Sequence, residues 1–347
     1  MKSKMSHGKA VRFCLASAIL LFGFLPVACD NSNDTTSPDT RQMERIFFSY
    51  IENDSARVAS ISSDGKDLDV IIEYGAIWSP PRADLLSYFS WNDADETGSV
   101  YVSNLDGTLI KRISSDNPAE SHSIFPVLSP RNDTVAYFAY PNNLFLSSIN
   151  GEARILLADD AENESIAAFS PSGDKIAYYG TGNRLVVINS DGSGKEDLSN
   201  EAYCYNDGFA HLEWSPDGEW IAYIGLDHGA VDVAVMSADG SHRVNLTKDV
   251  AEDCWPVWSP DGRYLAYSGG IDRDIWAMDL ADSSRHNLTE TADKGECFAQ
   301  WSADGTRILY IDLEPNGEGR GALTMIDVKS KKKAVLFVSA FVGFWEG

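Results

Sequence analysis

Basic residues are scarce in this sequence. Its 347 residues include 28 Lys and Arg against 52 Asp and Glu, which gives a formal net charge of −24. This balance argues against nucleic acid as a partner, because phosphates demand basic patches. It also argues against broad docking on anionic lipid headgroups, so any membrane attachment is expected to come from a lipid. An acidic surface otherwise fits solubility, a bound cation or a basic partner.

Several motifs of known chemistry are also missing. The six histidines form no H-x-H or H-E-x-x-H pattern, so the sequence gives only weak support to a metal site. The five cysteines lack the spacing of a zinc site. No G-x-S-x-G elbow occurs, which argues against the α/β-hydrolase domain of serine peptidases. A catalytic residue in this chain would therefore have no linear motif to mark it.

The N-terminus has the pattern of an export signal. A basic segment, residues 2–12, precedes the apolar stretch Phe13–Leu25, which is too short to span a bilayer comfortably. Cys29 follows Leu-Pro-Val-Ala, so residues 1–28 resemble a bacterial lipoprotein signal peptide with Cys29 as the lipidated first mature residue. Pro26 is unusual three residues before the cysteine, which leaves ordinary signal cleavage as the alternative. Residues 29–44 are polar and are expected to form a flexible tether.

The rest of the chain is organised by one repeated pattern. Its fullest copy, Leu212–Tyr223, reads LEWSPDGEWIAY: a strand, a tight S-P-D-G turn and a second strand. Taking the residue before each Ser as a marker gives positions 78, 128, 169, 214, 258 and 301. The intervals of 50, 41, 45, 44 and 43 residues match the period of about 40–45 residues for four-stranded propeller blades.

The first repeat lacks its innermost strand, and the C-terminus can supply it. Phe341–Trp345 resembles Cys297–Trp301, and Trp345 lies 44 residues after Trp301. The sequence therefore predicts an all-β fold, a seven-bladed β-propeller with four-stranded antiparallel blades, whose ring is closed by the C-terminal strand. Such closure leaves no unpaired edges between the two ends of the chain. Six blades with an unpaired N-terminal flap is the alternative.

These motifs resemble the TolB-type propeller repeat, a relative of WD repeats. The combination of an S-P-D-G turn, I-A-Y, a D-G-S hairpin and an N-L-T strand carries the resemblance, over residues 45–347. It identifies the repeat and not the activity. TolB itself has an α/β domain before its propeller, whereas this chain passes directly from tether to first blade, so a role in the Tol system is not carried over.

Acidic residues gather in the long connections that precede innermost strands. Four of them occupy one column, five residues before the marker: Glu73, Glu164, Asp253 and Glu296. Strand alternation places this column at one mouth of the central channel, where carboxylates could hold a divalent cation such as calcium or receive a basic peptide segment. The alternative is that each carboxylate accepts hydrogen bonds from a neighbouring blade or is simply solvated. His122, His211, Trp255 and Phe298 are expected near the same mouth.

Two cysteines occupy equivalent positions in consecutive repeats. Cys254 and Cys297 each lie four residues before a marker. Export to an oxidising compartment makes a disulfide plausible, and equivalence favours this pair. Buried free cysteine is the alternative, because three cysteines, Cys204 included, leave one unpaired. The residues alone do not decide between these states.

Two classes of function remain after these exclusions. The first is a non-catalytic lipoprotein of the bacterial cell envelope, facing the periplasm or exterior, whose propeller binds a protein or glycan. The second is an envelope polysaccharide lyase or hydrolase with a site in the channel. Oligogalacturonate lyases are similar seven-bladed propellers with several histidines around a metal, and this chain offers only scattered His122 and His211. A monomer is expected, since ring closure removes one usual reason to dimerise.

The lipoprotein interpretation predicts the effect of one substitution. Cys29→Ser should move the protein from the membrane pellet to the soluble envelope fraction, because the tether has no other apolar segment. Fractionation followed by immunoblotting measures this. A Cys29→Ser protein that still pellets after a salt wash would show that another contact holds it.

Overall fold

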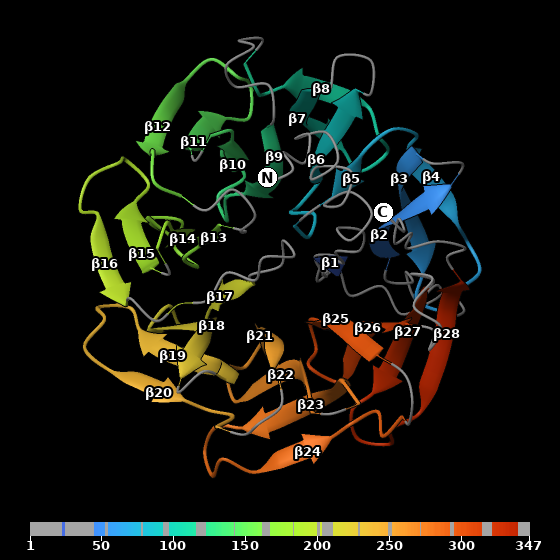
Figure 1. Cartoon of the computed structure of the whole chain (residues 1–347). Coiled ribbons are helices and arrows are strands. Elements are labelled where there is room, and N and C mark those ends of the chain that lie inside the picture. The colour runs from blue at the N-terminus through green and yellow to red at the C-terminus, as the bar shows by residue number, and fades with distance from the viewer. Residues whose placement is uncertain are drawn as a thin grey trace, which may run out of the picture.

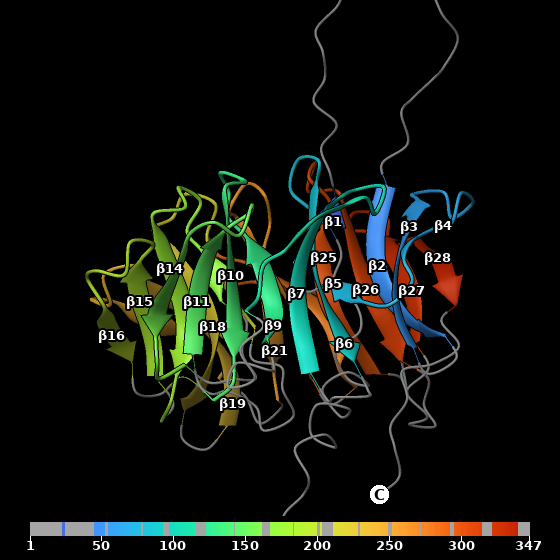
Figure 2. The same cartoon turned by 90° about the horizontal axis from the view of Figure 1, so that it is seen from above.

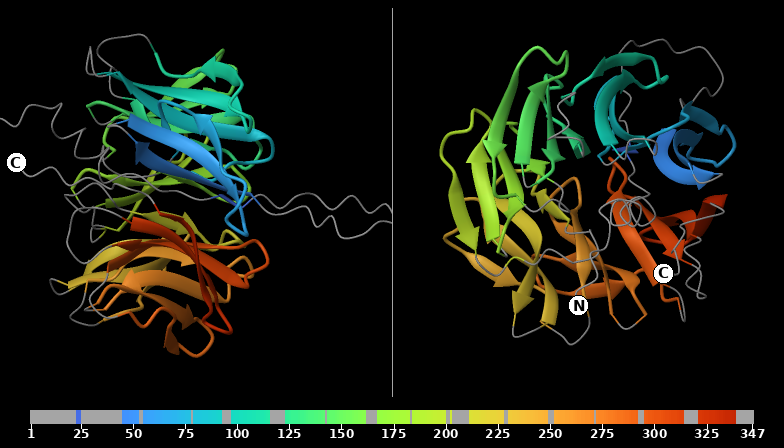
Figure 3. Two further views of the ribbon diagram at one scale, coloured as in Figure 1. Left: turned by 90° about the vertical axis from the view of Figure 1, so that its right-hand side faces the viewer. Right: turned by 45° about the horizontal axis from the view of Figure 1, so that its top comes forward.

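The computed structural model describes residues 23–24, 45–52, 55–77, 79–92, 97–115, 123–141, 143–161, 167–182, 184–199, 202, 211–227, 230–248, 252–270, 272–291, 295–313 and 321–338. They form seven antiparallel sheets of four strands each, arranged as blades around a central axis (Figure 1). The strands run between the two faces of the ring (Figure 2), and the sheets stand side by side around it (Figure 3). The predicted seven-bladed all-β propeller is confirmed. None of the described segments is a helix able to cross a membrane.

The first four blades follow each other in chain order. Blade 1 contains β1 (Gly23–Phe24), β2 (Arg45–Glu52), β3 (Ser55–Ser62) and β4 (Asp69–Ile72). Blade 2 contains β5 (Ala76–Ile77), β6 (Leu85–Asn92), β7 (Thr97–Asn104) and β8 (Leu109–Arg112). Blade 3 contains β9 (Ser123–Leu128), β10 (Thr134–Ala139), β11 (Asn143–Ser148) and β12 (Arg154–Ala158). Blade 4 contains β13 (Ala168–Phe169), β14 (Lys175–Gly180), β15 (Arg184–Asn189) and β16 (Glu196–Ser199).

The last three blades complete the ring. Blade 5 contains β17 (Leu212–Trp214), β18 (Trp220–Asp227), β19 (Ala230–Ser237) and β20 (Arg243–Asn245). Blade 6 contains β21 (Cys254–Trp258), β22 (Tyr264–Gly269), β23 (Asp274–Asp279) and β24 (Arg285–Asn287). Blade 7 contains β25 (Gly295–Trp301), β26 (Arg307–Leu313), β27 (Gly321–Asp327) and β28 (Lys333–Val338). In each blade the first strand is innermost and the fourth lies on the rim (Figure 1).

The S-P-D-G sequence forms a turn between the first two strands of a blade, and the polar groups of this turn hydrogen-bond to one another. In blade 5, Gly218 takes the left-handed conformation, with φ of 75°, and donates its N–H to Ser215 O at 2.9 Å. The Ser215 hydroxyl donates to Asp217 Oδ1 at 2.5 Å and accepts the Trp220 N–H at 2.9 Å. The same pattern of bonds recurs at Ser259 and Ser302. This motif therefore builds the scaffold.

The same turns also join neighbouring blades. A Cβ at Gly218 would lie 3.5 Å from Cδ of Pro171, and one at Gly262 would lie 3.7 Å from Cδ of Pro216. Each turn glycine thus packs on the proline of the preceding turn. The repeated proline therefore presets the turn and also provides the surface for the next blade.

The marker tryptophans of blades 5, 6 and 7 each bridge to the preceding blade. Each indole Nε1–H donates to the carbonyl of the residue before the marker in the preceding blade. The three bonds run from Trp214 to Ala168 at 3.1 Å, from Trp258 to Glu213 at 3.3 Å and from Trp301 to Val257 at 3.2 Å. All three side chains are at least nine-tenths buried. A buried indole with its donor satisfied is a stable core element.

Blade 1 is completed differently from the prediction. Its innermost strand in the structure is β1, in which Gly23 pairs with Phe47 and Phe24 pairs with Ile46. These two residues lie within the predicted signal peptide. Phe341–Trp345 lies outside the described residues, so its closure of the ring stays a prediction. The free edge of β2 can accept either segment, because backbone hydrogen bonds of a sheet edge do not depend on side-chain identity.

Two truncations distinguish the closing strands. A protein that begins at Cys29 lacks β1, and we expect it to keep the melting temperature of the full chain. Removing residues 339–347 from that protein should lower the melting temperature strongly and promote aggregation. Loss of a core aromatic alone costs about 3–5 kcal/mol, against a net stability of roughly 5–15 kcal/mol. If removing residues 339–347 leaves the melting temperature unchanged, the C-terminal strand does not close the ring.

Candidate functional site

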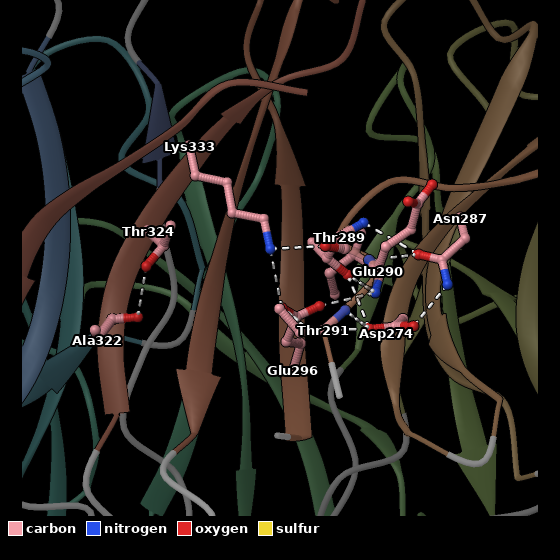
Figure 4. Close-up of polar contacts among 10 residues, drawn as sticks. Asp274, Asn287, Thr289, Glu290, Thr291, Glu296, Ala322, Thr324 and Lys333 are labelled. Carbon is pink, nitrogen blue, oxygen red and sulfur yellow. Dashed lines mark hydrogen bonds and ion pairs between the residues drawn. The ribbon is translucent and has the colours of Figure 1, made fainter. Parts of the chain in front are cut away.

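Glu296 belongs to a buried network between blades 6 and 7. It is fully buried, and its carboxylate accepts hydrogen bonds from Thr291 Oγ1 at 2.7 Å and from Ile275 N–H at 3.2 Å (Figure 4). Lys333 Nζ lies 3.8 Å from the same carboxylate. Burial raises the pKa of Glu296, and these hydrogen bonds together with Lys333 oppose the rise. Its contacts fit the alternative in which the carboxylate accepts bonds from a neighbouring blade.

The N-L-T motif lies in the same network. In blade 6, Asn287 Nδ2 donates to Asp274 at 2.6 Å, and Thr289 Oγ1 accepts the Ile275 N–H at 2.9 Å (Figure 4). Blade 5 repeats the arrangement with Asp232, Asn245 and Thr247. The motif thus holds the third and fourth strands of a blade together. Its buried aspartates are part of the scaffold.

The other predicted carboxylates occupy separate environments. Asp253 is buried and accepts the Gly270 N–H at 3.1 Å. Glu73 is exposed and lies 3.1 Å from Arg57 of its own blade. Glu164 and His122 lie outside the described residues. Within the described part of the chain, no group of three or more His, Cys, Asp and Glu side chains is placed to hold a metal ion.

An aromatic layer crosses the channel three residues before the markers. His211 and Trp255 have ring centroids 5.3 Å apart, and Trp255 and Phe298 have centroids 4.4 Å apart. The structure therefore brings these three predicted residues together. Sequence reasoning missed Phe125, which holds the same column in blade 3 and shares an apolar cluster with Trp255.

Backbone bulges set the direction of this layer. Phe125, Trp255 and Phe298 have φ of 55°, 58° and 60°, in the left-handed region that non-glycine residues rarely adopt. The strand register shifts at each of the three positions. A bulge re-aims a side chain, and such strained residues cluster at functional sites. Composition alone carries no sign of these bulges.

Cys254 and Cys297 are free thiols in the structure. This is the alternative to the disulfide that their equivalent positions favoured. Both side chains are half-buried, and desolvation raises the pKa of each thiol. The charge of one thiolate would also raise the pKa of the other thiol. A protonated thiol is a weak nucleophile, so the pair is chemically quiet in this state.

Glu213 lies on β17 and His211 directly precedes that strand. Both side chains point toward blade 6. Glu213 Oε2 accepts the Trp258 N–H at 2.7 Å, and His211 Nδ1 donates to Pro256 O at 3.0 Å. Burial raises the pKa of Glu213 to about 7 and lowers the pKa of His211 to about 4. The imidazole is therefore neutral at neutral pH, and its Nε2 is left as an acceptor.

Arg82 and Glu213 belong to blades on opposite sides of the ring. Arg82 belongs to the first turn of blade 2, and blades 2 and 5 lie across the channel from each other (Figure 1). Burial lowers the pKa of Arg82, and the charge of Glu213 opposes that effect. The side chain is nevertheless exposed to solvent.

The sequence did contain a signal for Glu213 and Arg82. The position just before the marker is apolar at Ile77, Val127, Ala168 and Val257, and Glu213 departs from that pattern. The turn of blade 2 has one residue more than S-P-D-G, and the extra length carries Arg82. Comparing the repeats column by column would have found both departures.

Comparisons with known proteins support the fold. No protein-family model matches the sequence, and no curated protein does. Among solved structures, TolB from Acinetobacter baumannii has a TM-score of 0.52 at 14% identity, over 82% of this chain and 77% of that one. An oligogalacturonate lyase in complex with manganese has a TM-score of 0.56 at 13% identity, over 85% of this chain and 86% of that one.

A third similarity extends to a larger protein. A puromycin-hydrolyzing peptidase from Mycobacterium tuberculosis has a TM-score of 0.62 at 16% identity, over 97% of this chain. This chain spans 55% of that peptidase's length. At these identities the similarities establish the fold alone. The propeller fold expected from the repeats is thus confirmed, and the similar structures include TolB, a lyase and a peptidase.

The raised pKa of Glu213 predicts a pH-dependent stability difference. The carboxyl titrates at 4.5 ordinarily and at about 7 in the folded protein. The unfolded chain therefore loses its proton first, and stability falls as pH rises from 4.5 to about 7. Glu213→Gln keeps an acceptor for Trp258 N–H and has no charge to bury. The free energy of unfolding of this variant, relative to that of wild type, should rise by up to about 3 kcal/mol between pH 4.5 and pH 8.

Urea unfolding at several pH values measures this difference. Glu219→Gln is the matched control, because Glu219 lies on the same blade and is exposed. Its stability relative to wild type should not change over this range. A Glu213→Gln curve parallel to that of wild type would show that Glu213 titrates as an ordinary carboxyl.

Proposed function

We propose that this chain is a non-catalytic lipoprotein of the bacterial cell envelope that binds a protein partner or a ligand in the channel of its propeller. Cys29 would anchor it to a membrane through a lipid, and residues 29–44 would tether the ring. The proposal is supported by the export signal, by the acidic composition and by a propeller fold of the kind found in TolB.

One observation carries the proposal. The repeated residues serve the scaffold: the turns, the marker tryptophans, the N-L-T strands and Glu296 all bind neighbouring strands or blades. Glu213 and His211 depart from the repeat at two positions of blade 5. Each bonds to blade 6 through one polar atom, and among the described residues Glu213 Oε1 and His211 Nε2 keep hydrogen-bonding capacity that the scaffold does not use. Polar groups of this kind in a concave site favour ligand binding.

The acidic mouth is a second element of the proposal. A divalent cation such as calcium, or a basic segment of a partner, would compensate the net charge of −24. Asp253 and Glu296 are engaged by neighbouring backbone, so the acidic loops around them would have to supply further ligands. The cation stays a prediction.

An envelope polysaccharide lyase or hydrolase is the second candidate. Glu213 is the observation that favours it, because a carboxyl with a pKa of about 7 suits general acid–base catalysis near neutral pH. The similarity to an oligogalacturonate lyase is compatible with such a role. Turnover of a polysaccharide that Glu213→Gln abolishes would favour the enzyme over the binding protein.

Photocrosslinking in intact cells tests the binding function. Gln300 is half-buried on β25 in the same column as Glu213, so a photoreactive residue there samples the channel. We expect an adduct of discrete mass at position 300. The same residue placed at Ile110, which is 41% exposed on the rim strand β8, is the control and should give no discrete adduct. Identical labelling at both positions would contradict a channel site.

A further inference from the structure

Two buried carboxyl groups meet at the junction of blades 6 and 7. Asp274 on β23 is 6% exposed, and Glu296 on β25 is 0% exposed. The Thr291 hydroxyl oxygen lies between them, 3.0 Å from Asp274 Oδ1 and 2.7 Å from Glu296 Oε1 (Figure 4). The two carboxyl groups are therefore separated by the width of one hydroxyl group.

The Thr291 hydroxyl cannot donate to both neighbours. A hydroxyl has one hydrogen and two acceptor lone pairs. If both carboxyl groups are ionised, one of the two short oxygen–oxygen contacts has no hydrogen between its atoms. A proton on one carboxyl group supplies the missing hydrogen, because that group then donates to Thr291 Oγ1 while Thr291 donates to the other.

The donors around Asp274 favour its ionised form. Its Oδ2 accepts the Asn287 Nδ2–H at 2.6 Å, and its Oδ1 accepts the Thr291 backbone N–H at 3.0 Å. Hydrogen bonds to a carboxylate stabilise its charge. Asp274 is therefore expected to remain the charged member of the pair.

Glu296 receives fewer and weaker hydrogen bonds. The Ile275 N–H lies 3.2 Å from Glu296 Oε2, and it is also 2.9 Å from Thr289 Oγ1. The Lys333 ammonium lies 3.8 Å from Glu296 Oε1 and donates to Thr289 O at 2.8 Å. Burial favours the neutral form and raises the pKa of Glu296. Glu296 is therefore the member of the pair that carries the proton.

We propose that Glu296 binds a proton in the folded protein and that the chain Glu296–Thr291–Asp274 is a proton-controlled joint between blades 6 and 7. In the protonated state, Glu296 Oε1–H donates to Thr291 Oγ1, and Thr291 donates to Asp274 Oδ1. When the proton passes to solvent, two buried negative charges face each other across one hydroxyl group, and their repulsion weakens the joint. Low pH therefore tightens the junction, and high pH loosens it. This inference does not depend on the proposed binding function.

Other charged groups surround the pair. The charged and titratable side chains on the elements packed against Glu296 are Arg273, Asp274, Glu290, Cys297, Tyr310, Asp312 and Lys333. Lys333 favours the ionised form of Glu296, whereas the charge of Asp274 favours its neutral form. Burial and the nearby carboxylates raise the pKa of Tyr310, so its hydroxyl stays protonated. Glu290 is exposed and pairs with Lys331.

A proton fits this pair better than a metal ion. Within the described ranges, no group of three or more His, Cys, Asp and Glu side chains is placed to hold a metal. The Lys333 ammonium at 3.8 Å would also repel a second cation from Glu296. Neither Glu296 nor Asp274 is therefore assigned as a metal ligand.

The joint also holds the strand that carries part of the aromatic layer. The Glu296 N–H donates to Arg273 O at 2.9 Å, and its carbonyl accepts the Ser268 hydroxyl. Phe298 lies two residues further along β25, and its ring packs on that of Trp255 at 4.4 Å. A change in the joint would therefore reach the channel through a single strand.

Infrared spectroscopy at pH 7 tests for the proton, because a protonated carboxyl group has a carbonyl band that ionised carboxylates lack. Glu213 has a pKa raised to about 7 by burial, so all spectra are compared in a Glu213→Gln background. Glu296→Gln keeps a donor for Thr291 and an acceptor for Ile275 N–H. We expect this second substitution to remove a protonated-carboxyl band.

Hydrogen exchange measured by mass spectrometry tests the joint itself. Peptides that contain Ile275 and Glu296 report the opening of the junction, and the ratio of wild-type to Glu296→Gln exchange rates cancels the intrinsic effect of pH. This ratio should rise at least about tenfold between pH 5 and pH 9, because only wild type acquires the second charge. Lys333→Met should move the rise to higher pH, since it removes the ammonium that favours ionised Glu296.

Glu290→Gln is the matched control, because Glu290 lies in the same segment as Thr291 and is exposed. It should exchange as wild type does at every pH, and melting temperatures show whether each variant folds. A carboxyl band that Glu296→Gln leaves unchanged would overturn the assignment of the proton. A band that is lost together with an exchange ratio that stays constant with pH would leave Glu296 a neutral acid and reject the joint as a switch.

Discussion

Blades 4 to 7 are joined by one repeated contact, the hydrogen bond from a buried marker tryptophan to the preceding blade. A four-stranded sheet cannot cover its own apolar faces, so each blade is stable only against its neighbours. Trp214, Trp258 and Trp301 fill that interface and satisfy their indole N–H there. The turn prolines and glycines add a second contact between consecutive turns. Because these contacts set the distance between blades, they also fix the walls of the channel.

Because the scaffold is made of repeats, a residue that departs from the repeat pattern is informative. Most blades place an apolar residue just before the marker, and blade 5 places Glu213 there. A half-buried carboxyl at this position has its pKa raised to about 7 by burial, so the substitution opposes stability at neutral pH. Local rules of a fold are commonly broken where function requires it. The same reasoning applies to Arg82, which lies in the longer first turn of blade 2.

A buried carboxylate is not by itself evidence for a metal site in this fold. Glu296 and Asp253 share a column that strand alternation placed at the channel mouth, yet backbone N–H groups and a threonine hydroxyl surround them. Glu296 stiffens the junction between blades 6 and 7, and Asp253 accepts a bond within blade 6, because leaving a buried N–H unpaired would be costly. Glu73, in the same column, is on the surface beside Arg57. Equivalent positions in a repeat thus share a backbone location and differ in environment.

The sequence by itself determined the blade period, the S-P-D-G turns and the number of blades, because each depends on contacts within one repeat or between adjacent repeats. It also placed His211, Trp255 and Phe298 near one another. Only the tertiary structure decided which side chains face each other across the channel. Arg82 and Glu213 lie in blades 2 and 5, which only the ring brings to opposite sides of one molecule (Figure 1). Bulges with positive φ at Trp255 and Phe298 break the two-residue alternation from which directions were predicted. The local sequence pattern therefore determines the blades. The direction of a side chain within the ring depends on the backbone of the whole assembly.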